Sequence, residues 1–138
     1  MIPDKIELEI VTPERKVLSE TVDSVVIPGT QGYLGVLPGH TPLLTGLMIG
    51  ELSYVQDGKE HVLAVSQGYA EVLRGKVSVL AERCEKAEEI DLERAEKSKQ
   101  RGEEVLKRND VPMDDFRRAE LRIQRAIARI QAKSHGLG

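Results

Sequence analysis

Apolar and polar side chains alternate along the first part of the chain, which predicts β-strands. Residues 5–11 alternate cleanly between apolar and charged side chains, as a strand with one buried face does. A short second strand is expected from Val17, and residues 21–27, rich in β-branched side chains, predict a third. The N-terminal region is therefore expected to be sheet with one face against a core.

The segment from Gly32 to Leu44 combines turn residues with apolar ones. It reads Gly-Tyr-Leu-Gly-Val-Leu-Pro-Gly-His-Thr-Pro-Leu-Leu. A solvated loop would not carry so many leucines, so we expect a strand, a tight turn at Pro38-Gly39 and a second strand that re-enters the core.

Two hairpins follow, with turns at Asp57-Gly58 and Arg74-Gly75. Such turns between alternating segments are strong hairpin signals. The flanking strands are expected at 50–56 with 60–66, and at 69–73 with 76–81. The sequence thus predicts eight or more short strands within about 80 residues, the rhythm of a sandwich or flattened barrel.

From Glu82 onward charged residues dominate and β-branched residues become rare. Helical periodicity predicts one helix at 92–107 and another at 115–133, separated by breakers at 108–114. A short connection favours an antiparallel hairpin. The expected fold is α+β in two segments: an all-β sandwich or flattened barrel at 1–84, then a two-helix hairpin at 85–138.

The two predicted helices differ in their apolar stripes. The first has a thin stripe with Ser98 and Lys99 in its middle, and its Gly102 costs about 1 kcal/mol relative to alanine. The second carries a heptad-like seam from Phe116 to Ile130 and an arginine face at Arg118, Arg122, Arg125 and Arg129. A hairpin with one good seam is expected to dock on the head weakly enough to be switched.

Composition narrows the possible functions. The 138 residues carry a net charge of −3, and only 3% are aromatic. Single-stranded nucleic acids need aromatic platforms and a basic groove, so a nucleic-acid partner is not expected. The single cysteine, Cys84, fits a reducing compartment. The N-terminus shows neither a signal nor a transit segment, which favours a bacterial chain, and no stretch approaches the roughly 20 apolar residues of a membrane span.

Catalytic groups are scattered rather than clustered. His40, His61 and His135 lie far apart in the sequence, and Cys84 has no neighbouring histidine. No P-loop is present, and no metal site is expected. An enzyme that uses Cys84 or His40 remains the weakest alternative.

The Gly32–Leu44 segment resembles a signature of the epsilon subunits of bacterial F-type ATP synthases. The resemblance implies a non-catalytic rotor subunit of the central stalk, which couples the gamma subunit to the c-ring. It also implies a mobile hairpin that inhibits ATP hydrolysis when it extends beside gamma against acidic surfaces of the alpha and beta subunits. The expected location is the cytoplasmic side of the bacterial inner membrane, with membrane association only through the complex.

The resemblance further implies that two turns of the head contact the c-ring loops or gamma. These residues are Gly29, Thr30, Gln31, Gly32, Tyr33, Gly39, His40 and Thr41. The position after Gly32 is often acidic in the family, where it can meet a basic rotor loop. Tyr33 instead offers area and one hydroxyl.

The residues from Ile90 to Ala95 match the I/L-D-x-x-R-A motif of epsilon subunits that bind ATP in their hairpin. The implied ATP-binding residues are Glu85, Asp91, Arg94, Arg101, Arg118, Arg125 and Arg129. Guanidinium groups suit phosphate oxygens, and without a magnesium-binding loop the nucleotide is not expected to be hydrolysed. No other cofactor is expected. The same residues are also typical of a capped helix with a solvated face, and a free-standing nucleotide-sensing module remains an alternative.

Overall fold

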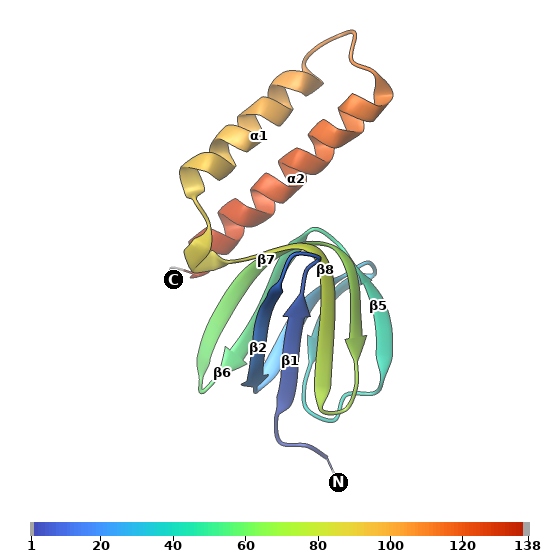
Figure 1. Cartoon of the computed structure of the whole chain (residues 1–138), viewed down its shortest axis with the longest axis vertical. Helices are drawn as coiled ribbons and strands as arrows, with labels where there is room; N and C mark the ends of the chain where they lie inside the picture. The colour runs from blue at the N-terminus through green and yellow to red at the C-terminus, as the bar shows by residue number, and fades with distance from the viewer. Residues whose placement is uncertain (1, 137–138) are drawn as a thin grey trace.

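The computed structural model describes residues 2–136 as a β-sandwich that carries a helical hairpin at one end (Figure 1). The strands are β1 (Ile6–Val11), β2 (Lys16–Val22), β3 (Ser24–Gly29), β4 (Gly32–Val36), β5 (Leu43–Leu47), β6 (Gly50–Gln56), β7 (Lys59–Val72) and β8 (Lys76–Lys86). A 3₁₀ turn, η1 (Ala87–Glu89), leads to α1 (Leu92–Leu106) and α2 (Met113–Gly136). The predicted fold class is confirmed.

Strand β7 belongs to both layers of the sandwich. Its first half pairs with β6 and its second half with β5, while β8 lies along its other edge from Leu63 to Val72. The change of layer occurs at Gly68, which has φ +157°. A Cβ there would lie 1.9 Å from the carbonyl oxygen of Leu80, so this crossing requires glycine.

Aliphatic side chains fill the space between the layers. Ile6, Leu8 and Ile10 on β1 are fully buried, as the alternation of residues 5–11 predicts. They join a cluster that includes Ile27, Leu52 and residues from β7 and β8. Because this core closes within the strands, the head has an apolar centre that does not involve the helices.

The strands differ from the sequence expectation in four places. Leu43 and Leu44, expected to re-enter the core, are 41% and 69% exposed, and only Leu47 of β5 is buried. The strand expected at 21–27 is divided at Asp23, because β2 ends at Val22 and β3 begins at Ser24. The Asp23 carboxylate pairs with Lys5 and accepts from the Asp57 N–H at 3.0 Å. The segments expected at 60–66 and 69–73 are one strand, because β8 pairs along both. Strand β8 continues to Lys86, so Glu85 and Lys86, assigned to the tail by sequence, still pair with the head.

The hairpin is built as the helical pattern predicts. Asp91 caps α1 by accepting from the Arg94 N–H at 3.1 Å, and α2 extends slightly beyond the expected 115–133. Gly102 is buried against α2, where a Cβ would lie 2.6 Å from Ile123 Cγ1 and 3.1 Å from the Ala119 carbonyl oxygen. The glycine that weakens the isolated helix therefore permits close packing of the pair.

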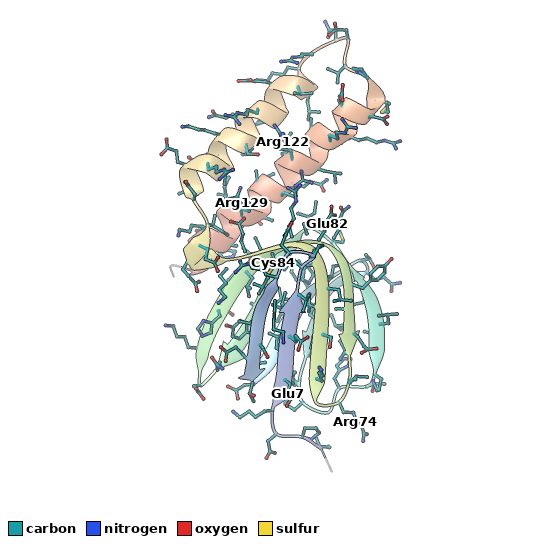
Figure 2. The ribbon with its side chains drawn as sticks, in the orientation of Figure 1. Glu7, Arg74, Glu82, Cys84, Arg122 and Arg129 are labelled. Carbon is teal, nitrogen blue, oxygen red and sulfur yellow. The ribbon has the colours of Figure 1, made fainter. Side chains whose placement is uncertain are left out.

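The hairpin docks on the head through α2, which packs against β6, β7 and η1, whereas α1 packs mainly on α2. The apolar part of this junction is a small cluster, separate from the main core, formed by Val62, Ala64, Ala87, Ile90 and Ala132. Polar contacts flank it: Arg129 forms a salt bridge with Glu85, with Nε 2.7 Å from Oε1, and His135 Nδ1 lies within hydrogen-bond distance of Glu51 at 2.8 Å. Figure 2 shows Arg129 on the hairpin above Cys84, with Arg74 at the far end of the head.

Candidate functional site

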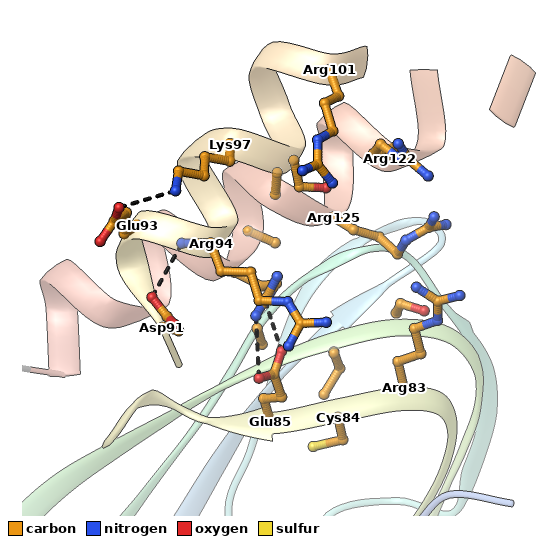
Figure 3. Close-up of a pocket in the computed structure, with 17 residues that line it drawn as sticks. Arg83, Cys84, Glu85, Asp91, Glu93, Arg94, Lys97, Arg101, Arg122 and Arg125 are labelled. Carbon is orange, nitrogen blue, oxygen red and sulfur yellow. Dashed lines mark hydrogen bonds and ion pairs between the residues drawn. The ribbon is translucent and has the colours of Figure 1, made fainter. Parts of the chain in front are cut away.

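A cavity of about 620 Å³ lies between the hairpin and the top of the head (Figure 3). Strands β7 and β8 form its floor, and α1 and α2 form its walls. Basic side chains dominate the lining: Arg83, Arg94, Lys97, Arg101, Arg122, Arg125 and Arg129, against the acidic Glu85, Asp91 and Glu93. The cavity is therefore suited to a polyanion.

Helical spacing brings these cations together from both walls. Arg94, Lys97 and Arg101 follow one another by three and then four residues on α1, so they share a face. Arg122, Arg125 and Arg129 repeat the same spacing on α2. Because the two helices form one hairpin over the head, both basic faces line the same space.

Only part of this positive charge is balanced by carboxylates. Arg129 pairs with Glu85 across the junction, and its Nη2 donates to Oε2 at 3.4 Å. Lys97 pairs with Glu93 at 3.1 Å, on the outer rim of α1. Within residues 2–136, Arg83, Arg94, Arg101, Arg122 and Arg125 form no salt bridge. Five guanidinium groups thus remain available to an anion.

The environment of Arg125 disfavours its own charge. Burial lowers the pKa of its guanidinium, and the nearby charges of Arg83 and Arg122 lower it further, while Glu82 opposes them. Such crowding of like charges is relieved when an anion binds between them. An anion beside Arg125 would offset the charges of Arg83 and Arg122.

Cys84 also lines the cavity but is not a nucleophile. Its side chain is buried, and burial raises the pKa of the thiol to about 12. Since the thiolate is the reactive form, almost none is present near neutral pH.

The structure brings together six of the seven residues expected to bind ATP: Glu85, Asp91, Arg94, Arg101, Arg125 and Arg129. Arg118 lies outside this cavity, one helical turn nearer the hairpin tip, where it pairs with Asp115 at 3.4 Å. The expected set lacks Arg83, Lys97 and Arg122. Helical spacing places Lys97 and Arg122 on the same helix faces as the expected residues. Arg83 gives no such signal, because it lies after residue 81, where the sequence predicted the last strand to end.

The two turns expected to contact partners lie at opposite ends of the head. Strands β3 and β4 form a hairpin, so Gly29–Tyr33 lies where β3 ends. There the Tyr33 hydroxyl accepts from the Glu51 N–H at 3.4 Å, beside the docked hairpin. Strand β4 then runs to the other end, where the Gly39 N–H donates to Arg74 O at 2.7 Å. His40 Nδ1 lies 2.7 Å from Thr41 O at that end.

The outer face of the sheet carries large apolar side chains. Tyr69 and Leu80 are directly paired between β7 and β8, and both are about 60% exposed (62% and 59%). Leu44 on β5 points to the same side and is 69% exposed. A shallow groove of about 780 Å³ borders this row. Such an exposed apolar face is typical of a protein interface.

Residues 2–136 group no three candidate metal ligands, and none of their helices is both long and apolar enough to cross a membrane.

Comparisons with known proteins match both parts of the chain. The family model described as "ATP synthase, Delta/Epsilon chain, beta-sandwich domain" matches residues 5–87, and the "long alpha-helix domain" of the same chain matches residues 88–134. The ATP synthase epsilon chain of Geotalea daltonii is 50% identical over 128 residues, 93% of each chain. That of Nitratidesulfovibrio vulgaris is 48% identical over 130 residues, 94% of this chain and 96% of its own.

Solved structures agree with these matches. A chain in the cryo-EM structure of the Euglena gracilis mitochondrial ATP synthase, OSCP/F1/c-ring, aligns over 100% of this chain and 84% of its own, with TM-score 0.81 and 25% identity. A chain of the Tetrahymena thermophila mitochondrial ATP synthase central stalk and c-ring aligns over 96% of this chain and 99% of its own, with TM-score 0.66. At 13% identity the second likeness concerns the fold alone.

The β-sandwich head and the two-helix tail together define a class of ATP synthase subunits that are structural and regulatory rather than catalytic. The chain belongs to the ATP synthase delta/epsilon family. A role in ATP synthesis and proton transport, in the central stalk, follows from that membership.

Proposed function

We propose that this subunit couples gamma to the c-ring and that its docked hairpin binds ATP as a regulatory ligand. The arginine-lined cavity carries this proposal. It opens between both helices and the head, and five of its guanidinium groups have no carboxylate partner within residues 2–136. A triphosphate supplies the negative charge that these groups lack.

The acidic residues of the cavity have separate tasks in this proposal. Glu85 holds Arg129 in place, and Asp91 caps α1 so that Arg94 projects into the cavity. Their remaining carboxylate lone pairs can accept hydrogen bonds from the ribose or the base. Because the sequence has no P-loop, the nucleotide is bound without being hydrolysed.

ATP that binds only the docked hairpin raises the fraction of molecules in which the hairpin is docked. A ligand that binds only this state stabilises it by about 2.7 kcal/mol at a hundredfold excess over Kd. The released hairpin presents its basic face to acidic surfaces of alpha and beta and blocks hydrolysis. ATP therefore relieves inhibition when it is abundant.

Calorimetry of the full chain with ATP tests the ligand. We expect Arg94→Ala and Arg125→Ala each to weaken binding by roughly tenfold or more, as for other charge-assisted bonds. Arg117→Ala is the matched control, because Arg117 is an exposed arginine of α2 outside the cavity. Equal binding by all four proteins, or no binding by wild type, would remove ATP from the proposal.

The head offers two different contacts because its turns lie at opposite ends. We assign Gly29–Tyr33 to the c-ring, since the family resemblance implies a ring contact at the Tyr33 position. We assign Gly39–Thr41 to gamma, because exposed Leu44 continues from it onto the outer apolar face. That face also favours an assembled subunit over a free-standing sensor. Membrane association, on the cytoplasmic side of the bacterial inner membrane, then comes only through the complex.

Photo-crosslinking in the assembled complex tests this assignment. A photoreactive residue at position 33 should capture the c subunit, and one at position 41 should capture gamma. Capture of the same partner from both positions would contradict it.

A further inference from the structure

Three arginines stand where the hairpin meets the head. Arg83 comes from β8, and Arg122 and Arg125 come from α2. All three line the first cavity and also a second one of about 640 Å³, which extends toward the hairpin tip. Figure 3 shows the guanidinium groups of Arg83 and Arg125 directed toward one another across the junction. The two cavities are therefore joined at a cluster of cations from both parts of the chain.

The cluster is unbalanced, unlike other arginines nearby. Arg129 is paired with Glu85 and Arg118 with Asp115, but within residues 2–136 no carboxylate forms a salt bridge with Arg83, Arg122 or Arg125. Burial lowers the pKa of Arg125 most, Arg83 and Arg122 lower it further, and the charge of Glu82 opposes them only in part. Like charges on two separable bodies repel, so the empty cluster opposes docking.

We propose that Arg83, Arg122 and Arg125 form a phosphate subsite that fastens the hairpin to the head. A phosphate group held among them bridges β8 and α2, and it converts a repulsive contact into an attractive one. Without an anion, the same three charges favour release of the hairpin. Arg83 is the residue that makes binding depend on docking, because it is the only one of the three on the head.

This inference deepens the proposed function and rests on it for its regulatory meaning. The recognised chemistry is a phosphate oxyanion, which the forked guanidinium group matches. The phosphate chain of ATP and a free polyphosphate share that chemistry. ATP and inorganic tripolyphosphate are therefore separate arms of the test.

The experiment measures docking by energy transfer in the full chain. Dyes are attached at Ser19→Cys on the head and Gln124→Cys on α2, two exposed positions outside both cavities. Every protein also carries Cys84→Ala, which removes the one native thiol of the sequence, so that dye reacts only at the two introduced cysteines. Docking is followed with sodium chloride, tripolyphosphate or ATP at matched ionic strength, so that general screening is separated from specific binding.

We expect Arg83→Gln without polyanion to raise the ratio of docked to released hairpin by about two- to fivefold, the size of an exposed charge–charge interaction. The same variant should lose most of the response to tripolyphosphate. Arg74→Gln is the control, because Arg74 is an exposed arginine at the opposite end of the head. It should behave as wild type in every arm.

The outcomes separate this subsite from the nucleotide proposal. If docking of the wild-type hairpin responds to tripolyphosphate but not to ATP, and Arg83→Gln loses that response, the phosphate subsite stands and the ATP proposal is removed. If calorimetry shows ATP binding but docking of Arg83→Gln equals that of wild type in every arm, the ATP proposal stands and the subsite is overturned. The subsite is also overturned if Arg83→Gln docks more weakly than wild type without polyanion. It is overturned as well if neither the substitution nor any anion changes docking.

Discussion

Substitution of Gly102 by alanine should loosen the pairing of α1 and α2. The new Cβ would lie 2.6 Å from Ile123 Cγ1 and 3.1 Å from the Ala119 carbonyl oxygen. Ile123 can rotate to relieve the first contact, but the backbone oxygen of Ala119 moves only if the two helices separate. The substitution therefore acts on the distance between the helices.

The magnitude follows from two opposing effects. Alanine raises helix propensity by about 1 kcal/mol, but this gain applies to α1 whether or not it is paired with α2. Overpacking of a close contact costs about 1–3 kcal/mol, and this cost applies only to the pair. The ratio of paired to separated helices should therefore fall by about fivefold at least and about 150-fold at most.

The assay is calorimetric binding of ATP to the full chain. Since only the paired hairpin lines the cavity, the apparent Kd should rise in proportion to the lost population once separated helices dominate. Gln100→Ala is the matched control, because Gln100 is exposed on the same helix. It adds propensity without touching α2. The thermal unfolding of the sandwich should stay unchanged in both variants, because the main core contains no helix residue.

A second substitution makes the reasoning sharper. Gly102→Ala combined with Ile123→Ala should weaken ATP binding less than the sum of the two single effects, because Ile123 no longer has to leave its rotamer to admit the new Cβ, whereas the Ala119 contact remains. Tighter ATP binding by Gly102→Ala, or strict additivity in the double variant, would refute the account of Gly102 as a packing contact.

Three further predictions concern the junction, the thiol and the outer face. Glu85→Gln should weaken docking of the ligand-free hairpin by roughly 1 kcal/mol, measured by energy transfer, because Arg129 loses its partner. The Cys84 thiol pKa is raised from 9.0 to about 12, so its share of stability is present below pH 9.0 and is lost as pH rises toward 12. Cys84→Ala should therefore show a smaller loss of stability over that range in chemical denaturation. Leu80→Ser should abolish co-purification with gamma while leaving the melting temperature nearly unchanged, because Leu80 is 59% exposed; retained co-purification would count against the assigned gamma face.

Local patterns predicted most individual elements. The alternation of residues 5–11 gave β1 because each side chain on a strand reports its own face. Asp91 predicted the start of α1 because an N-cap acts on the next turn only. The breakers predicted at 108–114 likewise separate the two helices, since α1 ends at Leu106 and α2 begins at Met113. In each case the deciding interaction lies within a few residues.

Contacts between distant segments were harder to predict. The continuity of β7 depends on β8 pairing along both of its halves, and Gly68 alone does not reveal that. Spacing placed Arg125 and Arg129 on one face of α2, but it could not show where along the hairpin the cavity ends. The family resemblance includes Arg118, which lies beyond the end of the cavity, and it omits Arg83, whose role depends on where the hairpin docks.

The alanine-rich junction between α2 and the head has a consequence for solubility. Ala64, Ala87 and Ala132 have small side chains, so undocking of the hairpin exposes little apolar surface at these positions. Larger side chains at the same positions would hold the tail more firmly, but a released tail would then invite aggregation. If the hairpin is released as we propose, these small side chains limit the apolar surface that each release exposes, so repeated release favours little aggregation.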